Sequence, residues 1–263
     1  MPRAMWTGSI SFGLVNIPVQ LYTAVKDKDL HFHQICSRDK SRVRQKLVCE
    51  ANHEEVDRAD LLKGFEIAPE QFVVFDKDEL ENLEPEKSSA IEVLDFVDID
   101  KIDPIYYEKP YYLAPKNAAK PYKLLLEAMK ESGKVAIAKF VMRGKEYLAA
   151  LRPMENAICL ELMHFADEVV ESKVVGDLGA NVKINQGELK MAKQLIETLY
   201  TDFKPENYQN EYRKRVHEAI EAKAQGQEII TGPAQPPEAT RVSDLMSALE
   251  HSLEQAKKRK RPA

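Results

Sequence analysis

The segment WTGSISFGLVNIPVQLYTAV, residues 6–25, decides the fold of this chain. Its apolar and polar residues alternate with the period of a β-strand, but the phase changes in the middle. Apolar side chains occupy even positions up to Leu14 and odd positions from Val15 onward. A shift of one residue sends side chains to the opposite face of a sheet. We therefore predict a single strand with a bulge or sharp bend at residues 13–16, a device that turns a strand around the corner of a β-barrel.

Length and composition are those of a globular protein. With 263 residues, 44% of them hydrophobic, the chain can form one large domain or two smaller ones. No apolar run reaches about 18 residues, so we expect no membrane span, and the N-terminus lacks the features of a signal peptide. The three cysteines are few and odd in number, which fits free thiols in a reducing cytoplasm.

Charge is strongly segregated along the chain. The net charge is −5, but residues 50–103 contain 18 acidic and 5 basic residues, so the remainder is positive. A positive surface next to a repelling negative one suits a protein that binds a polyanion with one face.

A series of basic residues follows the first strand at every second position. It consists of Arg38, Lys40, Arg42, Arg44 and Lys46. On a strand these side chains would share one face and form a stripe of positive charge that could bind a polyanion. A turn at residues 39–41 would leave Arg42, Arg44 and Lys46 as its secure part. The alternative is a solvated edge strand, where basic residues discourage edge pairing.

A second basic set lies on a predicted meander. Residues 116–132 have the pattern of a helix with Gly133 as its cap. Three β runs follow at residues 134–142, 146–151 and 157–165, joined by short links, and they predict antiparallel strands. The basic residues on these strands or turns are Lys139, Arg143, Lys145 and Arg152.

The acidic segment and the C-terminal part have weaker patterns. We predict helical turns at residues 60–65 and 76–83, and strands at residues 72–75 and 91–97. From Gly187 the period becomes helical. A Pro-rich linker follows at residues 231–241.

A short helix and a basic tail end the chain. A stripe of leucines at four-residue spacing predicts a helix that binds a partner, or one that packs back on its own core. The stripe consists of Leu245, Leu249 and Leu253, and the basic residues after it include Lys257, Lys258 and Arg259.

Catalytic and metal-binding patterns are weak. The sequence has no P-loop, GxSxG, GxGxxG or HExxH motif. His31, His33, Cys49 and His53 would be ligands in a metal-dependent hydrolase. Their spacing matches no standard zinc ribbon, because Asn52 stands where a second cysteine is needed. We predict no metal, no cofactor and no enzymatic activity.

Several long segments resemble the prokaryotic Ku proteins of non-homologous end joining. They include MWTGSISFGLVNIPVQLYTAV, DKDLHFHQI, IDPIYYEKPYYLAP, KPYKLLLEAM and GKVAIAKFVMRGKEYLAALRPMENAICLELMHFADEV. The helical segments QLIETLYTDFKPENYQNEYRKRVHEAIEAKAQGQEI and VSDLMSALEHSLE resemble that family's C-terminal part. The resemblance covers nearly the whole chain, in order.

The resemblance implies a fold class that is mainly β with α. An antiparallel β-barrel core with a bridging, DNA-encircling arm would span residues 1–185. A helical part of the core would follow at residues 186–230. After the linker, residues 242–263 would form a short helix and a flexible basic tail for contact with ligase or DNA.

The resemblance also implies a function. Members are homodimers that form a ring around double-stranded DNA ends and recruit an ATP-dependent DNA ligase, without being enzymes. Such a protein is expected in the cytoplasm, associated with the nucleoid. Many relatives carry a Cys-x-x-Cys pair where this chain has Cys49-Glu50-Ala51-Asn52, so a metal site does not carry over. The main alternative function is a protein-interaction adaptor that does not touch DNA.

Overall fold

The computed structural model describes residues 3–83, 89–176, 178, 182–226 and 245–259. The chain forms two compact units, Met1–Glu171 and Ser172–Ala263. The boundary predicted from the sequence stood at residue 185, and the division of functions between segments stays a prediction. Among the described helices, none is both long enough and apolar enough to cross a membrane.

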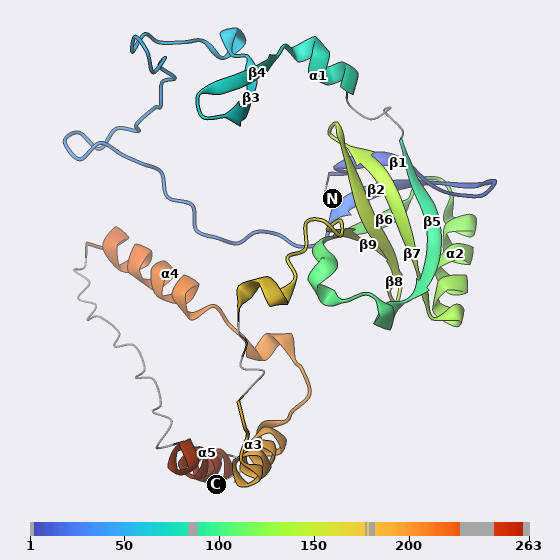
Figure 1. The fold of residues 1–263 in the computed structure, drawn as a ribbon, viewed down its shortest axis with the longest axis vertical. Helices are drawn as coiled ribbons and strands as arrows, with labels where there is room; N and C mark the ends of the chain where they lie inside the picture. Colours follow the sequence, from blue (N-terminus) through green and yellow to red (C-terminus); the bar gives the residue numbers. More distant parts are fainter. Residues whose placement is uncertain (1–2, 84–88, 177, 179–181, 227–244, 260–263) are drawn as a thin grey trace. The chain divides into compact units, whose positions relative to one another are not determined.

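The first unit is built around a closed seven-stranded β-barrel (Figure 1). Its strands are β1 (Trp6–Phe12), β2 (Val15–Thr23), β5 (Ala90–Asp98), β6 (Tyr107–Pro115), β7 (Lys134–Met142), β8 (Lys145–Pro153) and β9 (Ile158–Met163). They follow the order β1-β2-β6-β9-β8-β7-β5. Neighbours are antiparallel until β5 meets β1 in parallel and closes the barrel. The predicted barrel is confirmed, and the parallel closing pair is a feature that the prediction lacked.

A two-residue hairpin, not a bend, joins β1 to β2. Phe12 pairs with Val15, so the turn consists of Gly13 and Leu14. Gly13 has a φ of +57°, as the first central residue of a type II′ turn requires. Paired residues of antiparallel strands lie on one face, so this turn places an even position beside an odd one. It gives the same phase shift as a bulge, and the predicted single bent strand at residues 13–16 is therefore wrong.

Barrel closure depends on a close approach at Gly8. A Cβ atom at this position would lie 2.1 Å from the carbonyl oxygen of Ser89 and 2.1 Å from the Trp6 ring. The amide of Ser9 donates to that same carbonyl at 2.9 Å, and the Trp6 indole donates to the carbonyl of Val141 at 3.2 Å. Glycine here lets β1 and β5 pair directly.

Side chains fill the barrel. Fully buried residues from all seven strands include Ile10, Ile17, Val19, Leu21, Ile91, Leu113, Phe140, Leu151, Ile158 and Leu160. Barrels of this size are packed with side chains rather than open. The interior is therefore a core, and any DNA site must lie outside it.

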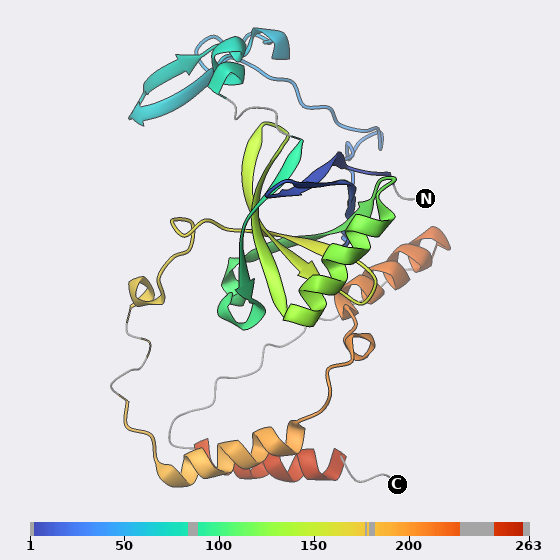
Figure 2. The same ribbon diagram turned by 90° about the vertical axis from the view of Figure 1, so that its right-hand side faces the viewer.

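Helix α2 (Ala119–Ser132) packs against the barrel, on β7 and β8 (Figure 2), and its buried residues join the barrel core. The hydroxyl of Tyr122 donates to the carbonyl of Leu113 at 2.6 Å and accepts from the amide of Ile158 at 2.7 Å. Burial raises the pKa of Tyr122. Gly133 ends the helix in the left-handed conformation, with φ +66°, which confirms its predicted role as the cap.

Residues 24–89, between β2 and β5, form an arm, and none of its described residues belongs to a barrel strand. Its described part contains the hairpin of β3 (Lys63–Ala68) and β4 (Gln71–Phe75). The short helices are η1 (Arg58–Asp60) and α1 (Lys77–Leu83). The predicted helical turn at residues 60–65 is wrong, because β3 already begins within it. Two further short turns, η2 (Ile99–Lys101) and η3 (Pro104–Tyr106), link β5 to β6.

The second unit is helical, as predicted. It contains η4 (Ser172–Val175), α3 (Gln186–Leu199), η5 (Pro205–Asn207), α4 (Glu211–Ala224) and α5 (Leu245–Arg259). Asn185 and Asn210 cap α3 and α4, because their side-chain oxygens accept from backbone amides in the first turn. Helix α5 packs against α3. The predicted linker at residues 231–241 lies outside the described residues.

Candidate nucleic-acid interface

The basic series of the arm lies outside any strand ladder. The bridge between Ile35 and Arg42 and the bridge between Val48 and Glu55 are the β pairings at this segment. Arg38 lies in the turn that separates the first pair, so the prediction of a continuous strand is wrong. The sequence predicted a possible turn at residues 39–41. In the structure the chain reverses two residues earlier, over residues 37–39.

All five basic side chains of this series are exposed. Lys46 pairs with Glu55 at 2.6 Å, and the ammonium of Lys40 donates to the carbonyl of Ser37 at 2.9 Å. Arg42 and Arg44 have no ion pair with any described residue. A surface ion pair contributes little, so Lys46 stays available to a phosphate, while the two arginines are available without competition.

The four basic residues predicted on the meander fall into two pairs, one exposed at a turn and one bound to carboxylates. Arg143 and Gly144 form the two-residue turn between β7 and β8 with φ of +55° and +77°, which places the exposed Arg143 and Lys145 at a hairpin tip. Lys139 instead pairs with Glu146 at 3.0 Å, and its ammonium lies 5.8 Å from the centre of the Phe165 ring.

Arg152 forms an ion pair with a buried carboxylate. Its guanidinium donates to Glu161 at 2.8 Å, and Glu161 is only 9% exposed. The hydrogen bond that Arg152 donates to Glu161 is the main cause that raises the pKa of Arg152. Burial, followed by the nearby Glu161, raises the pKa of Cys159 to about 12. Cys159 is therefore a neutral buried thiol, and the guanidinium serves first to balance Glu161.

The predicted partner helix is half covered by its neighbour. In α5, Leu249 and Leu253 are half-buried and Ala256 is buried, whereas Leu245 is 38% exposed. Lys257 is exposed. The side chains of Lys258 and Arg259 lie outside the part that the structure describes. The DNA-binding and partner-binding roles of all these residues stay predictions.

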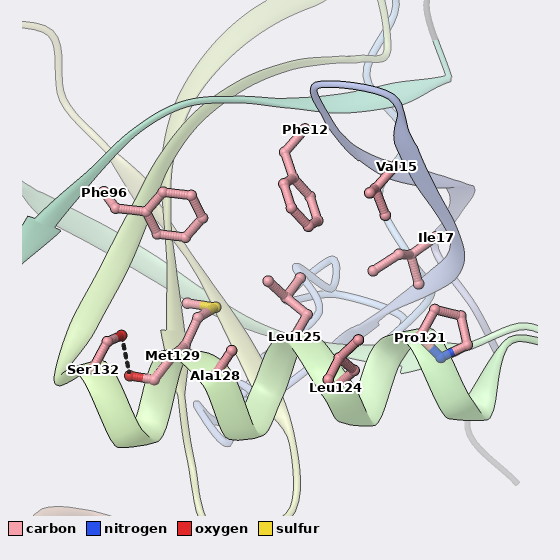
Figure 3. Close-up of a pocket in the computed structure, with 10 residues that line it drawn as sticks. All are labelled: Phe12, Val15, Ile17, Phe96, Pro121, Leu124, Leu125, Ala128, Met129 and Ser132. Carbon is pink, nitrogen blue, oxygen red and sulfur yellow. Dashed lines mark hydrogen bonds between the residues drawn. The ribbon is translucent and has the colours of Figure 1, made fainter.

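An apolar groove of about 310 Å³ lies on the barrel (Figure 3). Phe12 and Val15 from the β1–β2 hairpin face Leu124 and Met129 of α2 across it, and Phe96 of β5 closes one side. The lining carries no charged side chain. This groove therefore has no group that would bind a phosphate.

A polar cavity of about 540 Å³ is lined by residues that include Tyr107, Arg152 and Glu161. The Tyr107 hydroxyl is buried without a hydrogen-bond partner among the described residues. Burial, and then Glu161, raises the pKa of Tyr107. Since the arginine is balanced by the carboxylate, the cavity offers no net positive charge. Nowhere in the described ranges do three His, Cys, Asp or Glu residues gather as a metal site.

The sequence analysis missed the exposed apolar surface of the arm. On the β3–β4 hairpin, Phe65 is 68% and Ile67 is 62% exposed. Phe65, Val73 and Phe75 line an open hollow of about 450 Å³. The signal was present in KGFEIAPEQFVVF, where two β runs flank the short Pro-Glu turn. Exposed apolar surfaces of this kind are typical of interaction sites.

Taken together, these features define a β-barrel protein whose arm carries an exposed apolar hairpin and exposed arginines that form no ion pair within the described ranges. Residues 11–191 match the family model described as the Ku70/Ku80 beta-barrel domain. The chain belongs to the Ku family.

Similar proteins extend over almost the whole chain. It is 42% identical to the non-homologous end joining protein Ku 1 of Saccharopolyspora erythraea, over 98% of this chain and 80% of that protein. It is 41% identical to the Ku protein of Anaeromyxobacter sp., over 98% and 88% of the two chains. It is 39% identical to the Ku protein of Archaeoglobus fulgidus, over 97% of this chain and all of that protein.

Proposed function

We propose that this protein binds double-stranded DNA ends, independently of sequence, in repair by non-homologous end joining. Its relatives are named as end-joining proteins and match nearly its full length. The observation that carries the proposal is the exposed pair Arg42 and Arg44, which lack a carboxylate partner among the described residues. Arg143 and Lys145 supply a second exposed cluster on the barrel.

Binding to any sequence requires contacts to what all duplexes share. That is the phosphate backbone, which lysine and arginine neutralise with release of counterions. The exposed basic residues meet this requirement without any group aimed at base edges. Affinity should therefore fall steeply with salt and depend little on sequence.

We infer that the active form is a homodimer in which the arms of two copies close a ring. The apolar β3–β4 hairpin supports this, because Phe65 and Ile67 are exposed in one chain and a second copy would cover them. A closed ring can load only where a duplex stops, which explains a preference for ends.

We also propose that the C-terminal helices recruit an ATP-dependent DNA ligase. Helix α5 packs on α3, but its Leu245 and Met246 side chains remain exposed. The α3–α5 pair would present this surface as one unit. A protein of this function would be found in the cytoplasm at the nucleoid. The domain roles assigned to residues 1–185, 186–230 and 242–263 belong to the same proposal.

The decisive experiment compares linear duplex with a relaxed, covalently closed circle of the same sequence. The oligomeric mass is measured in parallel by light scattering. We expect a dimer that retains linear DNA after a salt wash and releases the circle. Equal retention of both forms would exclude a closed ring, and a flat salt response would exclude binding through phosphates.

Ligase recruitment is tested by removing residues 243–263. The shortened chain should still load on linear DNA but stimulate a partner ligase much less than the full chain does. Loading on linear DNA is the internal control for folding. Unchanged ligase stimulation would contradict the assigned role of the C-terminal helix.

A further inference from the structure

The arm contains the same turn twice. In the first copy the amide of Cys36 donates to the carbonyl of Ser41 at 2.8 Å, and the amide of Lys40 donates to the carbonyl of Cys36 at 3.0 Å. In the second copy Cys49 and His53 take the places of Cys36 and Lys40, with bonds of 2.9 and 2.8 Å. The copies are offset by a constant 13 residues, as the cysteine numbers show.

Two further features repeat at the same offset. Lys40 and His53 both adopt the left-handed conformation, with φ of +59° and +58°. A β bridge closes each turn, at Arg42 in the first and at Glu55 in the second. Residues 34–43 and 47–56 therefore form an internal repeat of structure, although few side chains are identical.

Each turn places two side chains where a Cys-x-x-Cys metal knuckle would have its thiols. The first position is Cys36 or Cys49, and the position three residues later is Asp39 or Asn52. Two such turns would supply the four thiolates of a structural zinc site. Here only half of those ligands are cysteine.

The other two positions are already used in local hydrogen bonds. Asp39 Oδ1 accepts from the amide of Ser41 at 3.0 Å and from its hydroxyl at 2.8 Å. Asn52 Oδ1 accepts from the amide of Glu54 at 3.1 Å. The bond from the Ser41 amide is the main cause that lowers the pKa of Asp39, so this acceptor is charged at neutral pH.

These residues do not fit a zinc ion. A carboxylate and an amide oxygen replace two soft thiolates, which are the ligands that select zinc. The bonds of Asp39 and Asn52 are those of Asx turns, which fix a loop without any ligand.

We propose that hydrogen bonds accepted by the side chains of Asp39 and Asn52 hold the two knuckle turns in the place of a metal, so that the arm of this chain folds without zinc. The inference goes beyond the proposed function, because it concerns what orders the arm and not what the arm binds. It assigns the two Asx residues, and not the two cysteines, as the determinants of turn geometry.

The test measures amide exchange by NMR in the full-length protein. Asp39→Ala should speed exchange at the Ser41 amide about fivefold, as expected for one lost hydrogen bond. Asn52→Ala should do the same at the Glu54 amide. The matched control is the double change Cys36→Ser and Cys49→Ser, which keeps a donor at both positions and should leave both rates unchanged.

Zinc content is measured on the same samples, from cells grown with added zinc. We expect no stoichiometric zinc in the native chain and no change in either exchange rate after treatment with a chelator. Stoichiometric zinc, or faster exchange in the serine variants or after chelation, would overturn the proposal. So would unchanged exchange in both alanine variants.

Discussion

The barrel and the arm contain similar strand sequences, but the apolar side chains are buried in the barrel and exposed in the arm. In β7, the pattern KVAIAKFVM buries Phe140 to 2% exposure. In β3, the pattern KGFEIA leaves Phe65 at 68%. Both segments form strands because local alternation favours them. Burial is a separate matter, since it needs neighbours, and the arm's hairpin has only two strands. The barrel therefore buries its apolar side chains within one chain, whereas the hairpin of the arm leaves them exposed, as the proposed homodimer requires.

The largest expected effect comes from shortening one apolar side chain in the barrel and one in the arm. Leu151 is fully buried, so Leu151→Ala should lower the free energy of unfolding by about 2–5 kcal/mol at every protein concentration. Phe65→Ala should alter only the part of the stability that depends on protein concentration, because in the proposed homodimer a second copy covers this exposed ring. Urea unfolding at two concentrations measures both. A loss of similar size and no concentration dependence for Phe65→Ala would break the comparison.

The buried hydroxyl of Tyr122 provides a second test of whether the barrel is complete within one chain. Tyr122→Phe removes one hydroxyl that bonds both to Leu113 and to Ile158. We expect a loss of about 1–3 kcal/mol, because the buried amide of Ile158 is left unsatisfied. The matched control is Tyr112→Phe, at a side chain that is 40% exposed and should cost little. Equal losses would show that the buried link between α2 and the strands has no special role.

The smallest effect concerns the arm's charges. Replacing Arg42 and Arg44 by alanine should weaken duplex binding about tenfold and reduce the magnitude of the salt slope by about 1.8, at 0.9 per phosphate contact. Fluorescence anisotropy over a salt series measures both quantities. Arg152→Ala is the comparison variant, because its guanidinium is bound to Glu161 and its loss should appear in stability instead. A stronger effect of Arg152→Ala on the salt slope would reverse the ranking of the basic residues.

Local patterns predicted the parts of the fold that local turns produce. The strands at residues 134–142 and 146–151 and the helix ending at Gly133 followed from periodicity and cap residues, and the structure has them there. The parallel pair of β1 and β5 could not be predicted in this way, because its partners lie far apart in sequence. The hairpin at Gly13 was mistaken for a bulge since both shift the phase by one residue.

The candidate interface was less predictable than the fold. The alternation of basic residues predicted one strand from Arg38 to Lys46, but the chain turns there, and Asp39 accepts hydrogen bonds from Ser41 in that turn. Charge counting also could not distinguish Arg143, which is exposed, from Arg152, which faces a buried carboxylate. That distinction depends on which strands become neighbours.

The parallel contact of β1 with β5 means that the whole arm is a loop inserted into a finished barrel. Register is set by Ser9 with Ala90 and by Ile10 with Ile91, independently of what the chain does in between. Loop-closure entropy grows only slowly, by about 0.6 kcal/mol for each doubling of length. The span of the arm can therefore change in evolution, and with it the opening of any ring it forms, at almost no cost to the barrel.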